Sequence, residues 1–94
     1  MKRDPDIRAL AATLAAVTDE NVMLDFLIDL CTPAELRALS DRWRIVPLLK
    51  AGKPYRDIYE KTGVSVTTVG RVARTIELGE GGYNTVLAKR MEQQ

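Results

Sequence analysis

The amino-acid sequence predicts an all-α protein of about six helices, arranged as a single domain over residues 1–94. Apolar residues recur at intervals of three and four along most of the chain, which is typical of helices that each bury one face. Proline, glycine and helix-capping residues stand between these stretches, where helices begin and end. No stretch has the alternation of a credible strand, and 94 residues suffice for one domain.

The first helix is predicted to begin at Asp4-Pro5, because aspartate is a good N-cap and proline suits the first helical position. The segment 18–20 closes this helix and can cap the next one. One apolar stripe follows the helix and consists of Ile7, Leu10, Ala11, Leu14 and Val17.

The second helix, from about Glu20 to Cys31, is apolar on nearly every side. Its apolar residues are Val22, Met23, Leu24, Phe26, Leu27, Ile28 and Leu30. A chain of 94 residues buries too little surface to enclose such a helix by itself. We therefore expect this helix to lie between two subunits, and the alternative is a central core helix in a compact monomer.

A capping box at residues 32–35 predicts the start of a third helix, which runs to about Ala51. Pro47 lies inside this helix and lacks a backbone donor, so it should kink or split the helix. The inner face is expected to carry Leu36, Leu39, Trp43, Val46 and Leu49.

The stretch 55–74 has the pattern of a helix-turn-helix, in which the second helix enters the DNA major groove. Gly63 supplies the turn and Ser65 opens the second helix. The apolar residues expected to meet across the turn are Ile58, Val64, Val69 and Val72. The alternative is a helical hairpin that only packs.

Charge is distributed unevenly, although the formal net charge is only +1. Residues 1–30 carry a net charge of −3, whereas residues 51–75 hold five basic and two acidic side chains. Positive charge therefore gathers on the segment predicted to approach DNA phosphates. Chance clustering on a solvated surface is the alternative.

Arg71 and Arg74 are the leading candidates for base or phosphate contacts, because arginine can bind guanine through two hydrogen bonds. Ser65 fits a helix cap better than a base contact. Gly70 lowers helix propensity, so we expect it to allow close approach of DNA or of another helix. The remaining candidates are the phosphate contacts Lys53, Arg56 and Lys61 and the first-turn residues Thr67 and Thr68.

After a glycine-rich break at residues 79–82, a last amphipathic helix is predicted. Its apolar residues are Tyr83, Val86, Leu87 and Met91. The organisation expected for the chain is therefore dimerisation helices over 1–52, a helix-turn-helix over 53–78 and a C-terminal helix over 79–94.

The composition argues against an enzyme, a zinc protein and a membrane protein. The sequence has no histidine and a single cysteine, Cys31, so neither a conventional zinc site nor a serine–histidine or cysteine–histidine pair can form. It has no phosphate-binding glycine loop, no apolar run of about 18 residues and no apolar leader after Met1. We expect a cytoplasmic protein that needs no cofactor.

Four stretches resemble the Trp repressor family, and within it the Trp-repressor-related YerC/YecD-type proteins. They are residues 32–36 (TPAEL), 42–45 (RWRI) and 55–72, together with the GYNTVL run at 82–87. The resemblance covers about residues 20–90. It implies an intertwined homodimer with one helix-turn-helix on each subunit, which would bind a roughly palindromic operator in double-stranded DNA.

The resemblance also implies a corepressor site. The matching positions are Thr32, Arg42, Arg71 and Thr75. Val72 stands where the repressor has a small glycine, so we expect overfilling of the indole slot and no response to tryptophan. Tyr59 stands where the motif prefers a small residue; it would either splay the two helices or point along the dimer surface.

Two functions follow from these patterns. The first is a dimeric, sequence-specific transcriptional regulator, expected to be a repressor. The alternative is a helical dimeric protein-interaction module that does not read DNA sequence.

Overall fold

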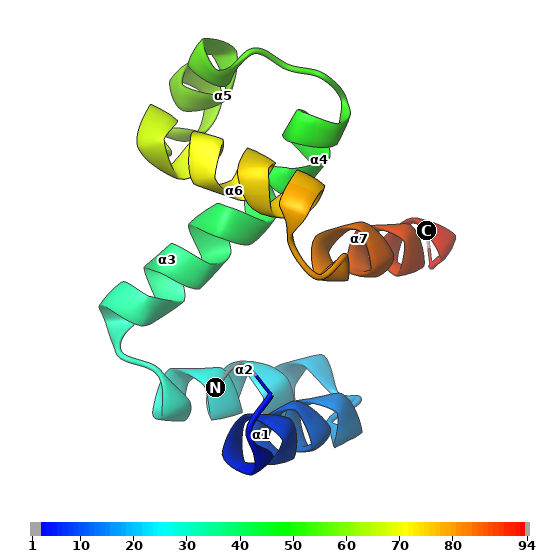
Figure 1. Ribbon diagram of the computed structural model, residues 1–94. Helices are drawn as coiled ribbons and strands as arrows, with labels where there is room; N and C mark the ends of the chain where they lie inside the picture. The colour runs from blue at the N-terminus through cyan, green and yellow to red at the C-terminus, as the bar shows by residue number, and fades with distance from the viewer. Residues whose placement is uncertain (1–2, 94) are drawn as a thin grey trace. The chain divides into compact units, whose positions relative to one another are not determined.

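The computed structural model describes residues 3–93 and confirms the all-α fold (Figure 1). Met1, Lys2 and Gln94 lie outside the described residues. The described helices are α1 (Pro5–Ala16), α2 (Glu20–Leu30), α3 (Pro33–Arg44), α4 (Val46–Lys50), α5 (Tyr55–Thr62), α6 (Val66–Leu78) and α7 (Gly82–Glu92). None of these helices is long and apolar enough to cross a membrane.

The described chain has one helix more than the six predicted, because the third predicted helix is split. Helix α3 ends at Arg44 and α4 begins at Val46, with Pro47 in its first turn. Proline has no backbone N–H and its ring crowds the preceding turn, so the helix cannot continue unbroken through this point. The expected effect of Pro47 is confirmed.

Local capping fixes the starts of the first three helices, as the sequence predicted. The Asp4 carboxylate accepts the backbone N–H of Ile7 at 2.9 Å and so caps α1. The Asp19 carboxylate does the same for α2. At α3 the Thr32 N–H donates to Glu35 Oε1 at 2.8 Å, and the Glu35 N–H donates to Thr32 Oγ1 at 3.1 Å. This reciprocal pair is a complete capping box.

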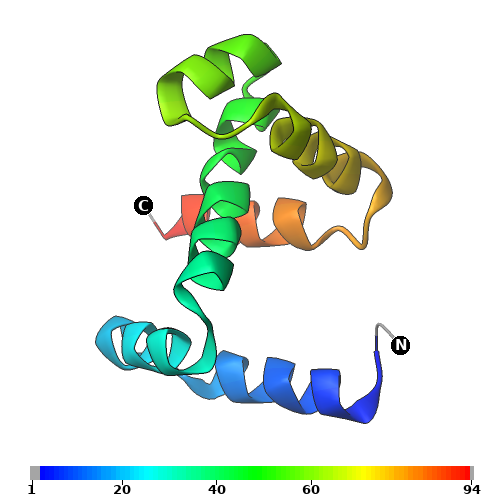
Figure 2. The ribbon, with the colours of Figure 1, turned by 90° about the vertical axis from the view of Figure 1, so that its left-hand side faces the viewer.

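The described chain forms two compact units, one ending at Leu36 and the other beginning at Arg37. The first contains α1 and α2, joined by a short link (Figure 2). No residue of these two helices is buried, and several large apolar side chains are exposed: Ile7, Leu10, Val22, Leu24, Ile28 and Leu30. The first unit thus has much apolar surface and no buried core of its own.

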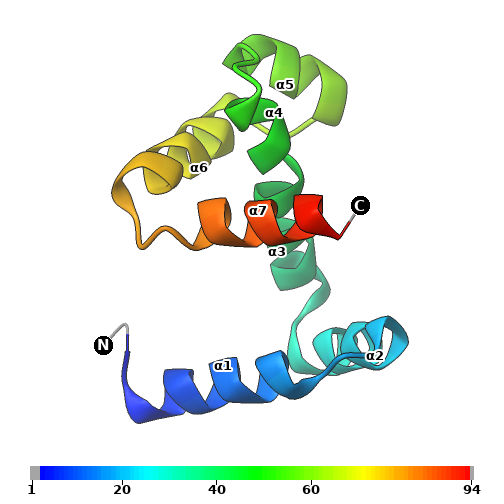
Figure 3. The same ribbon diagram turned by 90° about the vertical axis from the view of Figure 1, so that its right-hand side faces the viewer.

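The second unit has a buried core formed by Ile45, Val46, Ile58, Val64, Val69 and Val72. It lies where α5 packs on α6 and where α4 and α7 also contact α6 (Figure 3). Four of its members are the residues predicted to meet across the Gly63 turn, and that prediction is confirmed. The other two members, Ile45 and Val46, come from the segment 1–52 that the sequence analysis assigned to dimerisation. The predicted organisation as a single domain stays a prediction.

Helix α7 matches the last predicted helix and closes one side of this core. It follows Gly81, whose φ of 82° lies in the left-handed region that glycine adopts easily. Tyr83 stacks on Trp43 of α3, with ring centroids 6.4 Å apart and an interplanar angle of 21°. This pair joins α7 to the end of α3 beside the helix-turn-helix.

Candidate nucleic-acid interface

The turn of the helix-turn-helix forms as the sequence predicted. Gly63 ends α5 with φ 78°, and its N–H donates to the Tyr59 carbonyl at 2.7 Å. Ser65 begins α6, because its hydroxyl accepts the Thr68 N–H at 3.2 Å. A left-handed glycine followed closely by a serine N-cap lets α6 start in a new direction within a few residues.

The two helices of the motif are held by apolar packing on their inner side. Ile58 of α5 and Val69 and Val72 of α6 are all buried in the common core. Tyr59 is 50% exposed, so it lies at the surface and is not buried between the two helices; its place on a dimer surface stays a prediction. The inner side of the motif is therefore packed, and the polar side chains of α6 are left on its outer side.

The outer side of α6 carries the residues expected to contact DNA. Thr67, Arg71 and Arg74 follow one another at helical spacing and are exposed, so they share one face. Within residues 3–93 neither arginine makes an ion pair with an acidic side chain. One arginine can bind the edge of guanine through two hydrogen bonds, and a second can bind a phosphate. This face therefore has exposed donors of the kind that such contacts require.

Ser65 and Thr68 are turned toward each other. The Ser65 hydroxyl donates to Thr68 Oγ1 at 3.1 Å, in addition to capping the helix. Thr68 is only partly exposed. The expectation that Ser65 caps the helix is confirmed, and Thr67 is the more accessible of the two threonines.

Gly70 lies on the side of α6 that faces Tyr55 of α5. A Cβ added at Gly70 would meet Tyr55 Cε2 at 3.8 Å, an ordinary van der Waals contact. The packing of α5 on α6 therefore does not require glycine at this position.

The remaining predicted phosphate contacts are exposed: Lys53 lies just before α5, and Arg56 and Lys61 lie within it. Arg56 forms a loose ion pair with Glu60, 3.7 Å from Nε to Oε1, and such exposed pairs are weak. Lys53 and Lys61 line a shallow hollow of about 160 Å³ that Asp57 also lines. These exposed cations can approach a phosphate, although the carboxylates of Asp57 and Glu60 offset part of their charge.

Two features of the site were missed in the sequence. The first is Val66, which is 49% exposed at the first position of α6. Its place directly after the N-cap Ser65 is a signal that could have identified it. An exposed apolar side chain beside Thr67 suits contact with a thymine methyl group.

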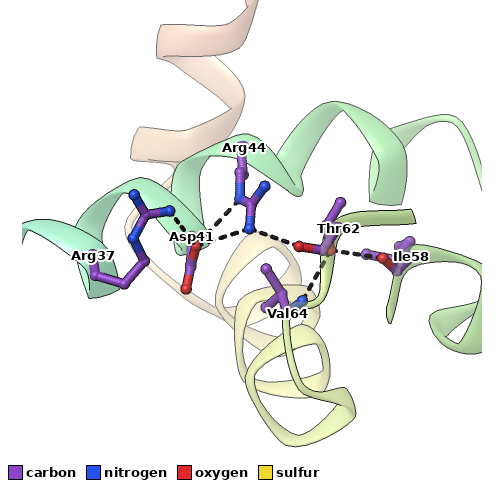
Figure 4. Close-up of polar contacts among 6 residues, drawn as sticks. All are labelled: Arg37, Asp41, Arg44, Ile58, Thr62 and Val64. Atoms are coloured by element: carbon purple, nitrogen blue, oxygen red, sulfur yellow. Dashed lines mark hydrogen bonds and ion pairs between the residues drawn. The ribbon is translucent and has the colours of Figure 1, made fainter. Parts of the chain in front are cut away.

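The second missed feature is Arg44, the last residue of α3. Its Nη2 donates to the Thr62 carbonyl at 2.8 Å, and its Nε donates to Asp41 Oδ1 at 3.2 Å (Figure 4). Arg44 and Thr62 are 18 residues apart, so no local spacing pattern connects them.

With this geometry established, comparison with known proteins identifies the family. The family of the Trp repressor protein matches residues 6–91. The chain belongs to the Trp repressor family. The match extends further toward the N-terminus than the resemblance seen in the sequence, and it confirms that resemblance. Members of the Trp repressor family are transcription regulators with a DNA-binding helix-turn-helix fold, not enzymes.

Two relatives support the assignment to the Trp repressor family. The chain is 28% identical over 92 residues to "Uncharacterized protein YerC" of Bacillus subtilis (strain 168). The aligned residues cover 98% of this chain and 88% of that protein. The fold matches the crystal structure of a TrpR-like protein from Eubacterium eligens ATCC 27750 with a TM-score of 0.86 and 32% identity. That match covers 94% of this chain and 91% of the other.

The two threonines among the four positions that match the corepressor site of the Trp repressor make local hydrogen bonds here. Thr32 takes part in the capping box of α3, and the Thr75 hydroxyl donates to the Arg71 carbonyl at 3.0 Å. Arg42 and Arg71 are exposed. Thr75 also borders a mostly apolar hollow of about 440 Å³, lined further by Trp43, Glu80, Gly82, Tyr83 and Val86. A corepressor site at Thr32, Arg42, Arg71 and Thr75 stays a prediction.

Proposed function

We propose that this chain is a homodimeric, sequence-specific transcriptional repressor of the cytoplasm that reads double-stranded DNA with α6 of each subunit. The observation that carries the proposal is the exposed face of Thr67, Arg71 and Arg74 on a capped helix with a buried inner side. Membership of a family of DNA-binding regulators supports it.

The apolar surface of α1 and α2 supports the homodimer. Side chains such as Leu24 and Ile28 are exposed, and neither helix has a buried residue. So much uncovered apolar surface is unfavourable in water, and a second copy of the same helices offers a matching surface. Two α6 helices related by a two-fold axis would bind half-sites about one helical turn apart, roughly 34 Å.

Sedimentation of matched variants tests the dimer. Ile28→Asp places a carboxylate on the exposed apolar surface of α2, whereas Asn21→Asp adds the same charge at a polar position of that helix. The wild-type protein and Asn21→Asp should sediment at twice the chain mass of 10.5 kDa, and Ile28→Asp as a monomer or unfolded chain. A wild-type monomer at micromolar concentration would contradict the dimer.

Selection of the purified protein against a random duplex library at physiological salt tests DNA reading. We expect enrichment of a palindromic sequence, called the selected duplex below. Arg71→Ala should then cost about 1–3 kcal/mol of binding free energy and relax specificity at one position of each half-site if Arg71 contacts a base. Equal weakening on every sequence, with a shallower salt dependence, would identify a phosphate contact instead.

A folded dimer that enriches no sequence would favour the protein-interaction module over the repressor. Arg74→Ala is the matched partner of Arg71→Ala, because both remove an exposed arginine from the same face of α6. A base contact and a phosphate contact would be separated by comparing the two variants on the selected duplex and on a scrambled one.

The repressor is proposed to act without tryptophan. Val72 is 2% exposed and packs in the core of the helix-turn-helix, so its branched side chain occupies space that a glycine would leave open. An indole beside it would overfill the site, which costs about 1–3 kcal/mol in packed interiors. Binding to the selected duplex should therefore be the same with and without millimolar tryptophan, and a rise in affinity would contradict this expectation.

A further inference from the structure

A chain of polar contacts runs from α3 to the turn between α5 and α6. The Asp41 carboxylate accepts from Arg37 Nη1 at 3.4 Å and from Arg44 Nε at 3.2 Å, both through Oδ1. Arg44 Nη2 lies 3.1 Å from the same Oδ1 and donates to the Thr62 carbonyl at 2.8 Å. Figure 4 shows Arg44 between the carboxylate and the turn.

Thr62 is where α5 ends, so its backbone and hydroxyl together hold the turn. Its Oγ1 donates to the Ile58 carbonyl and accepts the Val64 N–H at 3.1 Å. Its carbonyl is one of the last four of α5, which have no partner within the helix. Arg44, which belongs to α3, donates a hydrogen bond to this carbonyl. The carbonyl belongs to the residue directly before Gly63, whose φ is in the left-handed region.

We propose that Arg44, held by Asp41, is a positioning residue for the DNA-reading helix: it fixes the Thr62 carbonyl and so sets the direction in which α6 leaves the turn. This role rests on the proposed DNA-reading function. Binding groups lose affinity when they are displaced by a fraction of an ångström, so a residue that orients α6 affects sequence reading without touching DNA.

The guanidinium group suits this task. Its separate N–H donors form a rigid planar fork, so Nε can bind Asp41 while Nη2 binds Thr62. A lysine ammonium is a single flexible point charge and cannot hold both acceptors in fixed directions. The Asp41 side chain is mostly covered, which restricts the orientations open to Arg44.

The test compares Arg44→Gln with Arg37→Gln. Both substitutions remove one positive charge that contacts Asp41 from α3, but only Arg44 reaches the Thr62 carbonyl. Arg44→Gln should weaken binding to the selected duplex by up to about tenfold; the strength of a hydrogen bond from a charged donor sets this upper limit, because the contact also exists in the free protein. Arg37→Gln should stay within about twofold, because exposed ion pairs contribute little.

The binding profile separates a positioning role from direct contact. Loss of positioning should weaken binding to the selected duplex, while affinity for a scrambled duplex and the salt dependence stay unchanged. Equal loss on both duplexes together with a shallower salt dependence would mean that Arg44 contacts phosphate, and would overturn the proposal. Equal effects of the two glutamine variants would overturn it as well.

Hydrogen exchange provides a readout that does not involve DNA. Loss of the Arg44 contact should speed exchange of the Val64 amide, whose acceptor is the Thr62 hydroxyl, relative to the Ile7 amide at the α1 cap. Unchanged exchange at Val64 would overturn the proposal even if DNA binding changed. If the wild-type protein selects no sequence, the proposed function fails, and exchange alone decides whether Arg44 holds the turn.

Two further variants guard against a misfolded Arg44→Gln protein. Arg44→Lys keeps the charge and should bind the selected duplex more weakly than the wild type does. Asp41→Asn keeps every arginine and removes the carboxylate that orients Arg44, so it should also weaken binding to the selected duplex. If both variants match the wild-type protein in binding and in Val64 exchange, the proposal is wrong.

Discussion

Gly70→Ala separates the stability of α6 from its approach to DNA. Gly70 lies within α6, where a glycine has more backbone freedom to lose on folding than an alanine has. The added Cβ would meet Tyr55 Cε2 at 3.8 Å, a normal contact distance, so the fold has room for it. The substitution should therefore stabilise the folded protein, although it alters the helix that we propose to read DNA.

The expected gain is about 1 kcal/mol, the difference in helix propensity between glycine and alanine. For a chain of this size, that gain should raise the melting temperature by roughly 4–8 °C. Thermal unfolding followed by circular dichroism, at one fixed protein concentration, measures it. The concentration is fixed because the stability of a dimer depends on it.

Gly79→Ala is the matched control. At Gly79 an added Cβ would lie 2.6 Å from the Thr75 carbonyl oxygen, a backbone atom that cannot move away easily. Gly79→Ala should therefore lower the melting temperature while Gly70→Ala raises it. A lower melting temperature for Gly70→Ala would refute the reasoning, because it would mean that the site lacks the free space deduced from the structure.

DNA binding of the same variant decides why glycine stands there. If close approach of DNA requires Gly70, Gly70→Ala should be more stable and yet bind the selected duplex more weakly. Unchanged binding would mean that DNA does not approach this position. The packing of α5 on α6 gives no reason for a glycine, since Tyr55 tolerates the extra methyl group.

Three further predictions concern stability. Ile58→Ala, at a core position 1% exposed, should lower the free energy of unfolding by about 2–5 kcal/mol in urea denaturation, whereas Val66→Ala on the exposed face should change it by less than about 0.5 kcal/mol. Gly63→Ala should lower the free energy of unfolding by about 1–2 kcal/mol, because φ is 78°. No neighbouring atom crowds the site, so the loss is conformational, and Gly63→Asn should lower the free energy of unfolding less than Gly63→Ala does. The pKa of the Glu35 carboxyl lies below its ordinary value of 4.5, mainly because the backbone N–H of Thr32 donates to it and secondly because the Thr32 side chain does. This contribution to stability is therefore complete above the ordinary pKa and is lost as the pH falls through the lowered one. The stability difference between wild type and Glu35→Ala, measured by urea denaturation, should shrink below about pH 4.5, and a difference that does not vary with pH would contradict the assignment.

Much of the fold follows from local rules that can be read in the sequence. The caps at Asp4, Asp19 and Thr32, the break at Pro47 and the turn at Gly63 all depend on residues within about four positions of one another. Helical hydrogen bonds and capping contacts have that same short range, so sequence spacing predicts them well. The buried face of the helix-turn-helix could be predicted in the same way, from the short-range spacing of its apolar residues.

The candidate site was predictable only in part. The exposed face of Arg71 and Arg74 follows from helical periodicity, because side chains three or four positions apart share a face. The exposure of Val66 could also have been predicted from its position after the N-cap. The exposure of Tyr59 could not be predicted, because the sequence left two alternatives open and exposure depends on how α5 packs on α6.

The sequence by itself thus determined the helices, their caps and the turn that introduces α6. Tertiary structure alone decided which residues meet across long separations: Arg44 with the Thr62 carbonyl, and Tyr55 with the surface of Gly70. Such contacts depend on the direction in which each helix leaves its turn, and small changes in backbone angle there move a distant side chain by several ångströms. No periodic pattern in the sequence records those directions, so the contact between Arg44 and the turn that precedes α6 became visible only in the folded chain.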